Sequence, residues 1–406
     1  MSSGGRATLR RQAGVEQHAT TLELFYDLVF VFAITQVSHL LLDDLSWTGA
    51  GQATLVLLVV WWSWNYTTWV TNELDPESIT VRLLLIGLML ASLLMAIAIP
   101  DAFGDKALLF AGSYVLIQVG RHLFLTFVAA EAGTKERTRA ERILIWFVAA
   151  GVLWIAGALA DGEARTLFWL AALAVDYVAP LVTFWLPGAS RLTPDAWEVG
   201  TGHFAERFQL FIIIALGETI VITGATTSQH ELTTATIVAF ALAFLITAAL
   251  WWLYFNLVAA IAERRLAEAE NRTVLARDAY TYLHVVIVAG ILLTAVGDEL
   301  VIAHPTDELG DAELAAVVSG PALYLLALVL LRLRMSGTLG GRRLAGAAAC
   351  LAIGAIGTFA PALVVAALLF GVLVVVIVGD QLAAAHRRRR GEPSPLERVQ
   401  TAPDAG

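Results

Sequence analysis

The chain consists of long apolar runs separated by short polar breaks. Runs of about 18 or more apolar residues predict membrane-spanning helices, because this length crosses the hydrocarbon core of a bilayer. With 58% hydrophobic and 15% charged residues, the chain has more apolar sequence than a soluble core could bury. The sequence therefore predicts an all-α, polytopic integral membrane protein with about 12 transmembrane helices. These lie near 22–42, 50–70, 80–99, 107–130, 143–160, 165–186, 205–225, 236–261, 278–302, 313–334, 342–359 and 361–379.

The last two runs could be a helical hairpin or one kinked helix, because Gly357 and Pro361 interrupt the apolar sequence. Arginines stand on both sides of this stretch, at Arg342 and Arg343 before it and at Arg387–Arg390 after it. Basic residues collect on the cytoplasmic side of a membrane, so an even number of crossings should separate the two clusters. This favours the hairpin.

The same charge rule predicts that both termini are cytoplasmic. Of the 26 lysines and arginines, only Lys106 and Arg165 would then lie outside, and only Arg121 lies deep in a helix. The opposite loops are acidic, as at Asp43 and Asp44. We therefore expect a multi-pass membrane protein with its basic loops on the cytoplasmic side.

Both ends of the chain are expected to be cytoplasmic tails, at 1–21 and at 381–406, the second basic and disordered. No apolar core precedes Leu22, so we expect the first helix to be the targeting signal. Arg387–Arg390 are typical of a stop-transfer anchor, with a patch for lipid headgroups or nucleic acid as the alternative. The single cysteine, Cys350, is expected to be a small buried hydrophobe.

The two halves of the chain share a pattern that suggests an internal duplication. Trp61-Trp62 in the second run corresponds to Trp251-Trp252 in the eighth, and the first and seventh runs align Glu23 with Glu206. Six helices per half would give two parallel repeats, at 22–190 and 191–380, an architecture common in transporters. A substrate would then lie between the halves. Chance similarity among apolar helices is the alternative.

Charged side chains inside apolar runs are the candidate functional residues, because an ionised group in hydrocarbon is unfavourable unless it is paired or lines a pathway. They are predicted to form a pathway or a buried polar network of Glu23, Asp27, Arg121, Asp176, Glu206, Arg207, Glu218, His284, Asp298 and Glu299.

The position of a residue along its helix gives its depth in the membrane, and this depth predicts how some of these residues pair. Arg121 needs a carboxylate, and Asp27 is the acid nearest to it in depth. Asp176 and Glu218 have no basic residue at equal depth, so they could carry protons. The alternative is that they hold helices together. His284 is expected to be a hydrogen-bonded packing residue.

The sequence offers no support for metal or nucleotide chemistry, and no nucleophile and base stand at a recognisable spacing. We therefore expect no enzyme activity and no cofactor. The bilayer and an unidentified small solute or ion are the expected partners. Nucleic acid is not expected, and self-association into a homo-oligomer remains open.

Three motifs stand in order along the chain. They are Glu23-Leu24-Phe25-Tyr26-Asp27-Leu28-Val29-Phe30, His203-Phe204-Ala205-Glu206-Arg207-Phe208 continuing to Glu218, and Gly297-Asp298-Glu299-Leu300. Together they resemble the bacterial low temperature requirement protein A (LtrA) family, and the resemblance covers residues 15–385. It implies an integral protein of the bacterial cytoplasmic (inner) membrane linked to growth in the cold, and it implies no molecular activity.

The segment 25–30 is also similar to the Phe-Ser-Asp-Gly-Val-Phe signature that opens each six-helix unit of a family of endolysosomal and bacterial potassium channels. Here Tyr26 and Leu28 replace the small residues of that signature, so no pore residue is carried over. The comparison therefore supports only an arrangement of two consecutive six-helix units.

Three functions compete at this point. The first is a transport or permeation protein, proton-coupled through its buried acids. The second is a non-transporting scaffold or sensor that supports the envelope in the cold. The third is a membrane-embedded enzyme acting on lipid, which is disfavoured because no catalytic set is visible.

Overall fold

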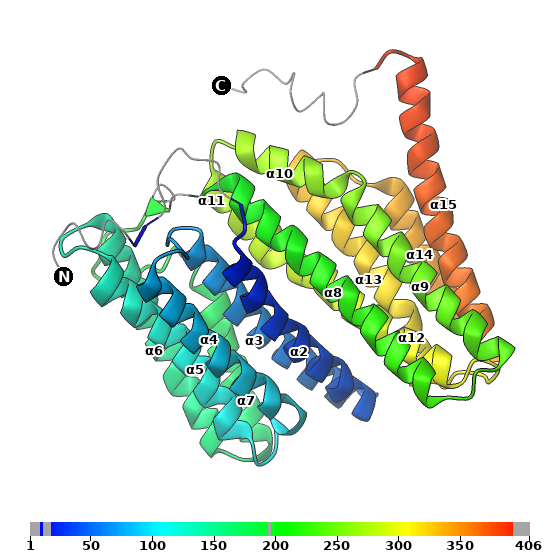
Figure 1. Cartoon of the computed structure of the whole chain (residues 1–406), viewed down its shortest axis with the longest axis horizontal. Coiled ribbons are helices and arrows are strands. Elements are labelled where there is room, and N and C mark those ends of the chain that lie inside the picture. Colours follow the sequence, from blue (N-terminus) through cyan, green and yellow to red (C-terminus); the bar gives the residue numbers. More distant parts are fainter. Residues whose placement is uncertain (1–8, 11–17, 194–195, 198, 393–406) are drawn as a thin grey trace. The chain divides into compact units, whose positions relative to one another are not determined.

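A computed structural model describes residues 9–10, 18–193, 196–197 and 199–392, and the elements of this part of the chain are helices (Figure 1). The α-helices are α2 Thr21–Asp43, α3 Trp47–Thr71, α4 Ile79–Ala98, α5 Ala107–Phe124, α6 Lys135–Leu159, α7 Gly162–Val178, α8 Thr201–Gln229, α9 Thr234–Phe255, α10 Val258–Glu268, α11 Arg272–Leu275, α12 His284–Ala303, α13 Asp311–Ser336, α14 Gly341–Ile356 and α15 Ala362–Arg389. Two π-helical segments, Leu125–Ala129 and Ala276–Leu283, continue α5 and join α11 to α12.

Within the described residues, ten helical spans are long and apolar enough to cross a membrane. The all-α, polytopic architecture expected from the sequence is thereby confirmed. The runs predicted near 50–70 and 165–186 also form helices, α3 and α7, but neither is among the ten. Helix α7 has only 17 residues, and the tryptophans, threonines and asparagine of α3 lower its mean hydropathy.

The chain turns between α14 and α15, as the charge pattern predicted. A short 3₁₀ turn, Gly357–Phe359, ends α14, and Pro361 stands at the N-cap of α15, where its missing N–H leaves no helical bond unmade. The start of α14 meets the later part of α15, because Arg342 and Arg343 lie 3.4 and 3.3 Å from the carboxylate of Asp380. The two helices are therefore antiparallel. Residues 381–389, expected in the tail, continue α15.

The helices form two compact units, and the boundary between them falls inside α8. Of the described residues, those up to Leu40 and those of Thr48–Arg207 form the first unit, and Leu41–Trp47 with those from Phe208 onwards form the second. In the first unit, α4 packs against α5, α5 against α6 and α6 against α7, side by side (Figure 1). The tryptophans Trp61, Trp62, Trp64, Trp154 and Trp169 fill its core.

In the second unit, glycines let α12 and α13 approach closely. A Cβ on Gly290 would stand 2.7 Å from the backbone nitrogen of Tyr324, and one on Gly297 would stand 2.9 Å from Cα of Val317. From the other helix, a Cβ on Gly320 would stand 2.5 Å from the nitrogen of Thr294. Small residues at such crossings allow backbone-to-backbone packing, which stabilises helix pairs in membranes.

We expect Gly290→Ala to destabilise the protein by about 1–3 kcal/mol, because the added methyl would meet the backbone of α13, which moves only with the whole helix. Gly87→Ala is the matched control, since a Cβ at this helical position meets nothing within 4 Å. Unfolding of the detergent-solubilised chain checks both variants. Equal stability of the two would contradict the close approach of α12 and α13.

Candidate functional site

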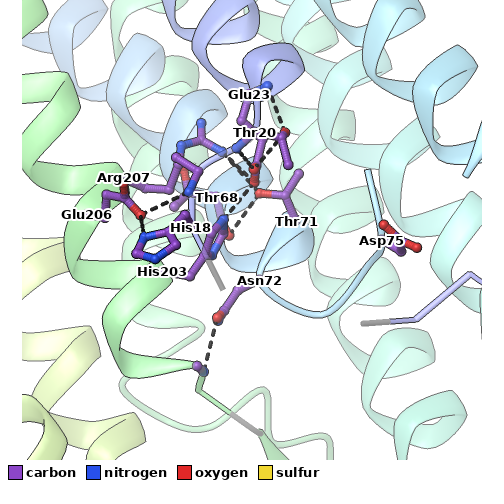
Figure 2. A network of polar contacts seen from close by, with 12 residues as sticks. His18, Thr20, Glu23, Thr68, Thr71, Asn72, Asp75, His203, Glu206 and Arg207 are labelled. Atoms are coloured by element: carbon purple, nitrogen blue, oxygen red, sulfur yellow. Dashed lines mark hydrogen bonds and ion pairs between the residues drawn. The ribbon is translucent and has the colours of Figure 1, made fainter. Parts of the chain in front are cut away.

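Four buried ionisable side chains from two helices form an ion-pair cluster in the first unit. Glu23 projects from α2, and His203 and Arg207 project from the first turns of α8 (Figure 2). Asp27 follows Glu23 one turn later on α2. Nη1 of Arg207 lies 2.9 Å from Oε1 of Glu23, and Nη2 lies 2.5 Å from Oδ1 of Asp27. Nε2 of His203 is also 2.9 Å from Oε1 of Glu23. The guanidinium thus bridges two carboxylates that stand one helical turn apart.

Helix α3 supplies further donors and acceptors to this cluster. Trp64 donates its indole N–H to Oδ1 of Asp27 at 2.7 Å, and Nη1 of Arg207 donates to Oγ1 of Thr71 at 3.3 Å. The side chains of Glu23, Asp27, Trp64 and Arg207 are fully buried. Charges in such a low-dielectric environment are stable only when they are paired and hydrogen-bonded.

The other oxygen of Glu23 explains why α2 begins where it does. Oε2 accepts hydrogen bonds from the backbone and the hydroxyl of Thr20, both at 2.9 Å, while the N–H of Glu23 donates to Oγ1 of Thr20 at 3.3 Å. This is a capping box, which satisfies free N–H groups at the start of a helix. Glu23 therefore has two roles, a local one in capping and a long-range one in pairing with α8.

A reciprocal contact links the start of α8 back to the residues before α2. Oε2 of Glu206 accepts the backbone N–H of Ala19 at 2.9 Å and lies 3.4 Å from Nδ1 of His18 (Figure 2). The acid in the first turns of each helix thus meets a histidine at the start of the other. Because His203 and Arg207 meet Glu23 and Asp27 in the same order, α2 and the first turns of α8 start at the same end of the first unit.

The predicted pairing of Arg121 with Asp27 is wrong. Asp27 takes its cation from Arg207, and Arg121 has no carboxylate partner among the described residues. The guanidinium of Arg121 donates instead to Gln118 Oε1, to Thr67 Oγ1 at 2.9 Å and to the carbonyl of Ser63 at 3.3 Å. Its carbon Cζ also lies 5.5 Å from the ring centroid of Tyr66. Neutral acceptors and an aromatic face thus surround a fully buried cation.

Asp176 is a buried acid held by neutral donors. Its Oδ2 accepts hydrogen bonds from the hydroxyl of Tyr114 at 2.7 Å and from the indole N–H of Trp154 at 3.0 Å. Gln118 donates to the Tyr114 hydroxyl at 3.1 Å, so a continuous hydrogen-bonded chain connects Asp176 to Arg121. No ion pair involves Asp176 in the part of the chain that the structure describes, as its depth predicted.

The remaining acids lie in the second unit. Glu218 on α8 is buried, and so is Asp298 on α12, whose Oδ2 has no hydrogen-bond partner among the described residues. Glu299 is half-buried beside it. A buried polar atom without a hydrogen bond is unfavourable in an apolar interior, and Asp298 makes no ion pair among the described residues that would offset this, unlike the paired acids of the first unit.

His284 is buried and hydrogen-bonded in the second unit. It donates through Nδ1 to the carbonyl of Ala279 at 2.8 Å, and its Nε2 is hydrogen-bonded to the hydroxyl of Tyr254 at 2.9 Å. Its ring stacks on Tyr280 with centroids 4.7 Å apart. The carbonyl can only accept, so Nδ1 of His284 carries a proton. The ring stands directly after the π-helical segment Ala276–Leu283, a kind of segment that often marks functional positions in helices.

Within the described residues, no group of three or more His, Cys, Asp or Glu side chains gathers to hold a metal ion. The arrangement can instead pair charges and bind or release protons. The sequence prediction overlooked Thr71, Trp154 and the pairing role of His203. The spacing in the sequence could have revealed this pairing. His203 and Arg207 are four residues apart, and so are Glu23 and Asp27, so each pair lies on one face of its helix and the two faces carry opposite charges.

The family model of the bacterial low temperature requirement A protein (LtrA) matches residues 18–378, which include the whole ion-pair cluster. An uncharacterized protein of Rhizobium meliloti (strain 1021) is 36% identical over 382 residues, covering 94% of this chain and 93% of the relative. No solved structure matches the chain.

Proposed function

Because the chain belongs to the bacterial low temperature requirement A family, as its three motifs predicted, we propose that it is a proton-coupled transport protein of the bacterial cytoplasmic membrane. It moves a small solute or ion, uses its buried acids as proton carriers and so supports growth in the cold. The proposal is consistent with the ten apolar spans.

The observation that carries this proposal is a pair of buried acids without a cationic partner among the described residues, one in each unit. Asp176 is bound by two neutral donors, and Asp298 keeps a buried oxygen without a hydrogen bond. A carboxylic acid in such surroundings can take up and release a proton without breaking an ion pair. Glu218, buried on α8, is the third carrier that we propose.

The architecture proposed for this function is twelve crossings in two parallel six-helix repeats, 22–190 and 191–380, with both termini in the cytoplasm. The parallel starts of α2 and α8 support it, because six crossings between them return the chain to the same side. Helices α3 and α7 would complete the twelve.

Purified full-length chain in liposomes tests the proposed function. A pH gradient should drive uptake of a small cation or organic solute from a mixed panel, with proton movement recorded by an internal dye. Protein-free liposomes are the control for leak. Absence of both solute flux and proton flux across the panel would contradict transport and favour the second candidate.

That second candidate is a non-transporting scaffold or sensor, favoured by one specific observation. The cluster around Arg207 is closed, with Glu23 and Asp27 both bound to the same guanidinium and shielded from solvent. Such a cluster fixes helices in place. A scaffold would need only this cluster, whereas a transporter also needs acids that change protonation.

A further inference from the structure

One end of the second unit carries an unusual concentration of arginines. We call Arg332, Arg342, Arg343 and Arg387–Arg390 the arginine rim. They lie at the end of α13, at the start of α14 and at the end of α15. The contacts gather these segments at one place, because the aliphatic chain of Arg342 lies over Gly379 of α15, whose Cβ would stand 3.1 Å from Cδ of that arginine.

The positive charge of the rim is only partly compensated. Arg342 and Arg343 share one carboxylate, Asp380, and Arg332 donates to the hydroxyl of Thr338 at 3.2 Å. Arg387–Arg390 make no ion pair within the described residues, and three of them are exposed. A strong positive field therefore stands at this end, with exposed guanidinium groups free to bind an anion.

Geometry places this field at the level of lipid headgroups. Helix α15 has 28 residues, or about 42 Å at the usual rise, whereas the hydrocarbon core is about 30 Å thick. Its last turns extend past the neighbouring ends of α13 and α14 (Figure 1). Exposed leucines stand among the arginines, at Leu333, Leu339, Leu344 and Leu382. Apolar side chains beside cations match a surface that meets both acyl chains and phosphates.

We propose that the arginine rim binds the phosphodiester headgroups of anionic phospholipids. Guanidinium groups recognise phosphate oxygens through paired, charge-assisted hydrogen bonds, and the leucines contact the acyl chains. This interaction goes beyond stopping translocation, because it selects lipids by headgroup charge. It is independent of the proposed transport function, since it uses none of the buried acids.

Native mass spectrometry of the full-length chain in neutral detergent tests this surface. The chain is offered equal amounts of phosphatidylglycerol and phosphatidylcholine, and retained lipids are counted. We expect a preference for phosphatidylglycerol that weakens as salt rises. Replacing Arg387, Arg388, Arg389 and Arg390 together by glutamine should reduce this preference by more than about tenfold, since each cation near an anionic surface contributes separately.

Two controls make the result decisive. Glutamine at the exposed Arg82, Lys106, Lys135 and Arg272 removes the same charge from other places and should leave the preference intact. Excess glycerol phosphate should compete poorly, because it lacks acyl chains. The proposal is overturned if the rim variant keeps the parent's preference, if the control variant loses as much, or if glycerol phosphate or a short polyuridine displaces the lipid completely.

Discussion

Replacing Arg207 by leucine is expected to lower the free energy of unfolding by about 3–5 kcal/mol, the largest stability change that we predict. The substitution leaves the carboxylates of Glu23 and Asp27 fully buried without the cation that binds both. Their desolvation is then no longer offset by a short ion pair. Unfolding of the purified chain in mixed micelles measures the effect.

A double-mutant cycle separates this pairing from general damage to the core. Asp27→Leu combined with Arg207→Leu should cost less than the sum of the single variants, because the second change removes a charge that the first left unpaired. Arg207→Lys keeps the charge but loses the fork that spans two carboxylates, so it serves if the leucine variant fails to fold.

The comparison variant for the cycle is Arg121→Leu, which removes an equally buried guanidinium with no carboxylate partner among the described residues. Its interaction energy with Asp27→Leu should be smaller than that of Arg207→Leu. If the interaction energy with Asp27→Leu is larger for Arg121→Leu than for Arg207→Leu, Asp27 pairs with Arg121, as the sequence predicted. That result would refute the ion pair between Asp27 and Arg207.

The sequence predicted the helical architecture well, because hydrophobic length and charge asymmetry act locally along the chain. The hairpin of α14 and α15 is the clearest case. Gly357 and Pro361 were compatible with either a hairpin or one kinked helix, and the arginines on either side favoured the hairpin. In the structure, Arg342 and Arg343 at the start of α14 pair with Asp380 of α15, as a hairpin requires.

The sequence could not predict which charges meet. Arg121 and Arg207 both lie at the depth of Asp27, and depth measured along a helix carries no information on which helices are neighbours. The structure decides this through packing, since Arg207 stands one turn after His203 and both face α2. Asp176 was easier to predict, because the absence of a cation at its depth is visible in the sequence alone.

The largest functional effect is expected for the buried acids. Asp176→Asn should reduce proton-driven flux in liposomes to the level of protein-free vesicles while leaving the fold intact. The carboxamide oxygen can still accept the hydrogen bonds of Tyr114 and Trp154, so the local contacts survive. The amide does not titrate, so a proton can no longer be taken up and released there.

Asp298→Asn and Glu218→Gln extend this test to the second unit, where the same change of an acid to its amide should abolish flux and growth at low temperature. Asp161→Asn is the matched control, because that carboxylate is exposed and lies only 3.3 Å from Arg165 at the start of α7. It should transport like the parent. If all three buried variants fold and transport like this control, the acids hold helices together and proton coupling is refuted. If flux is lost only for the variants of one unit, protons pass through that unit alone. The two proposed repeats would then share a fold but not a function.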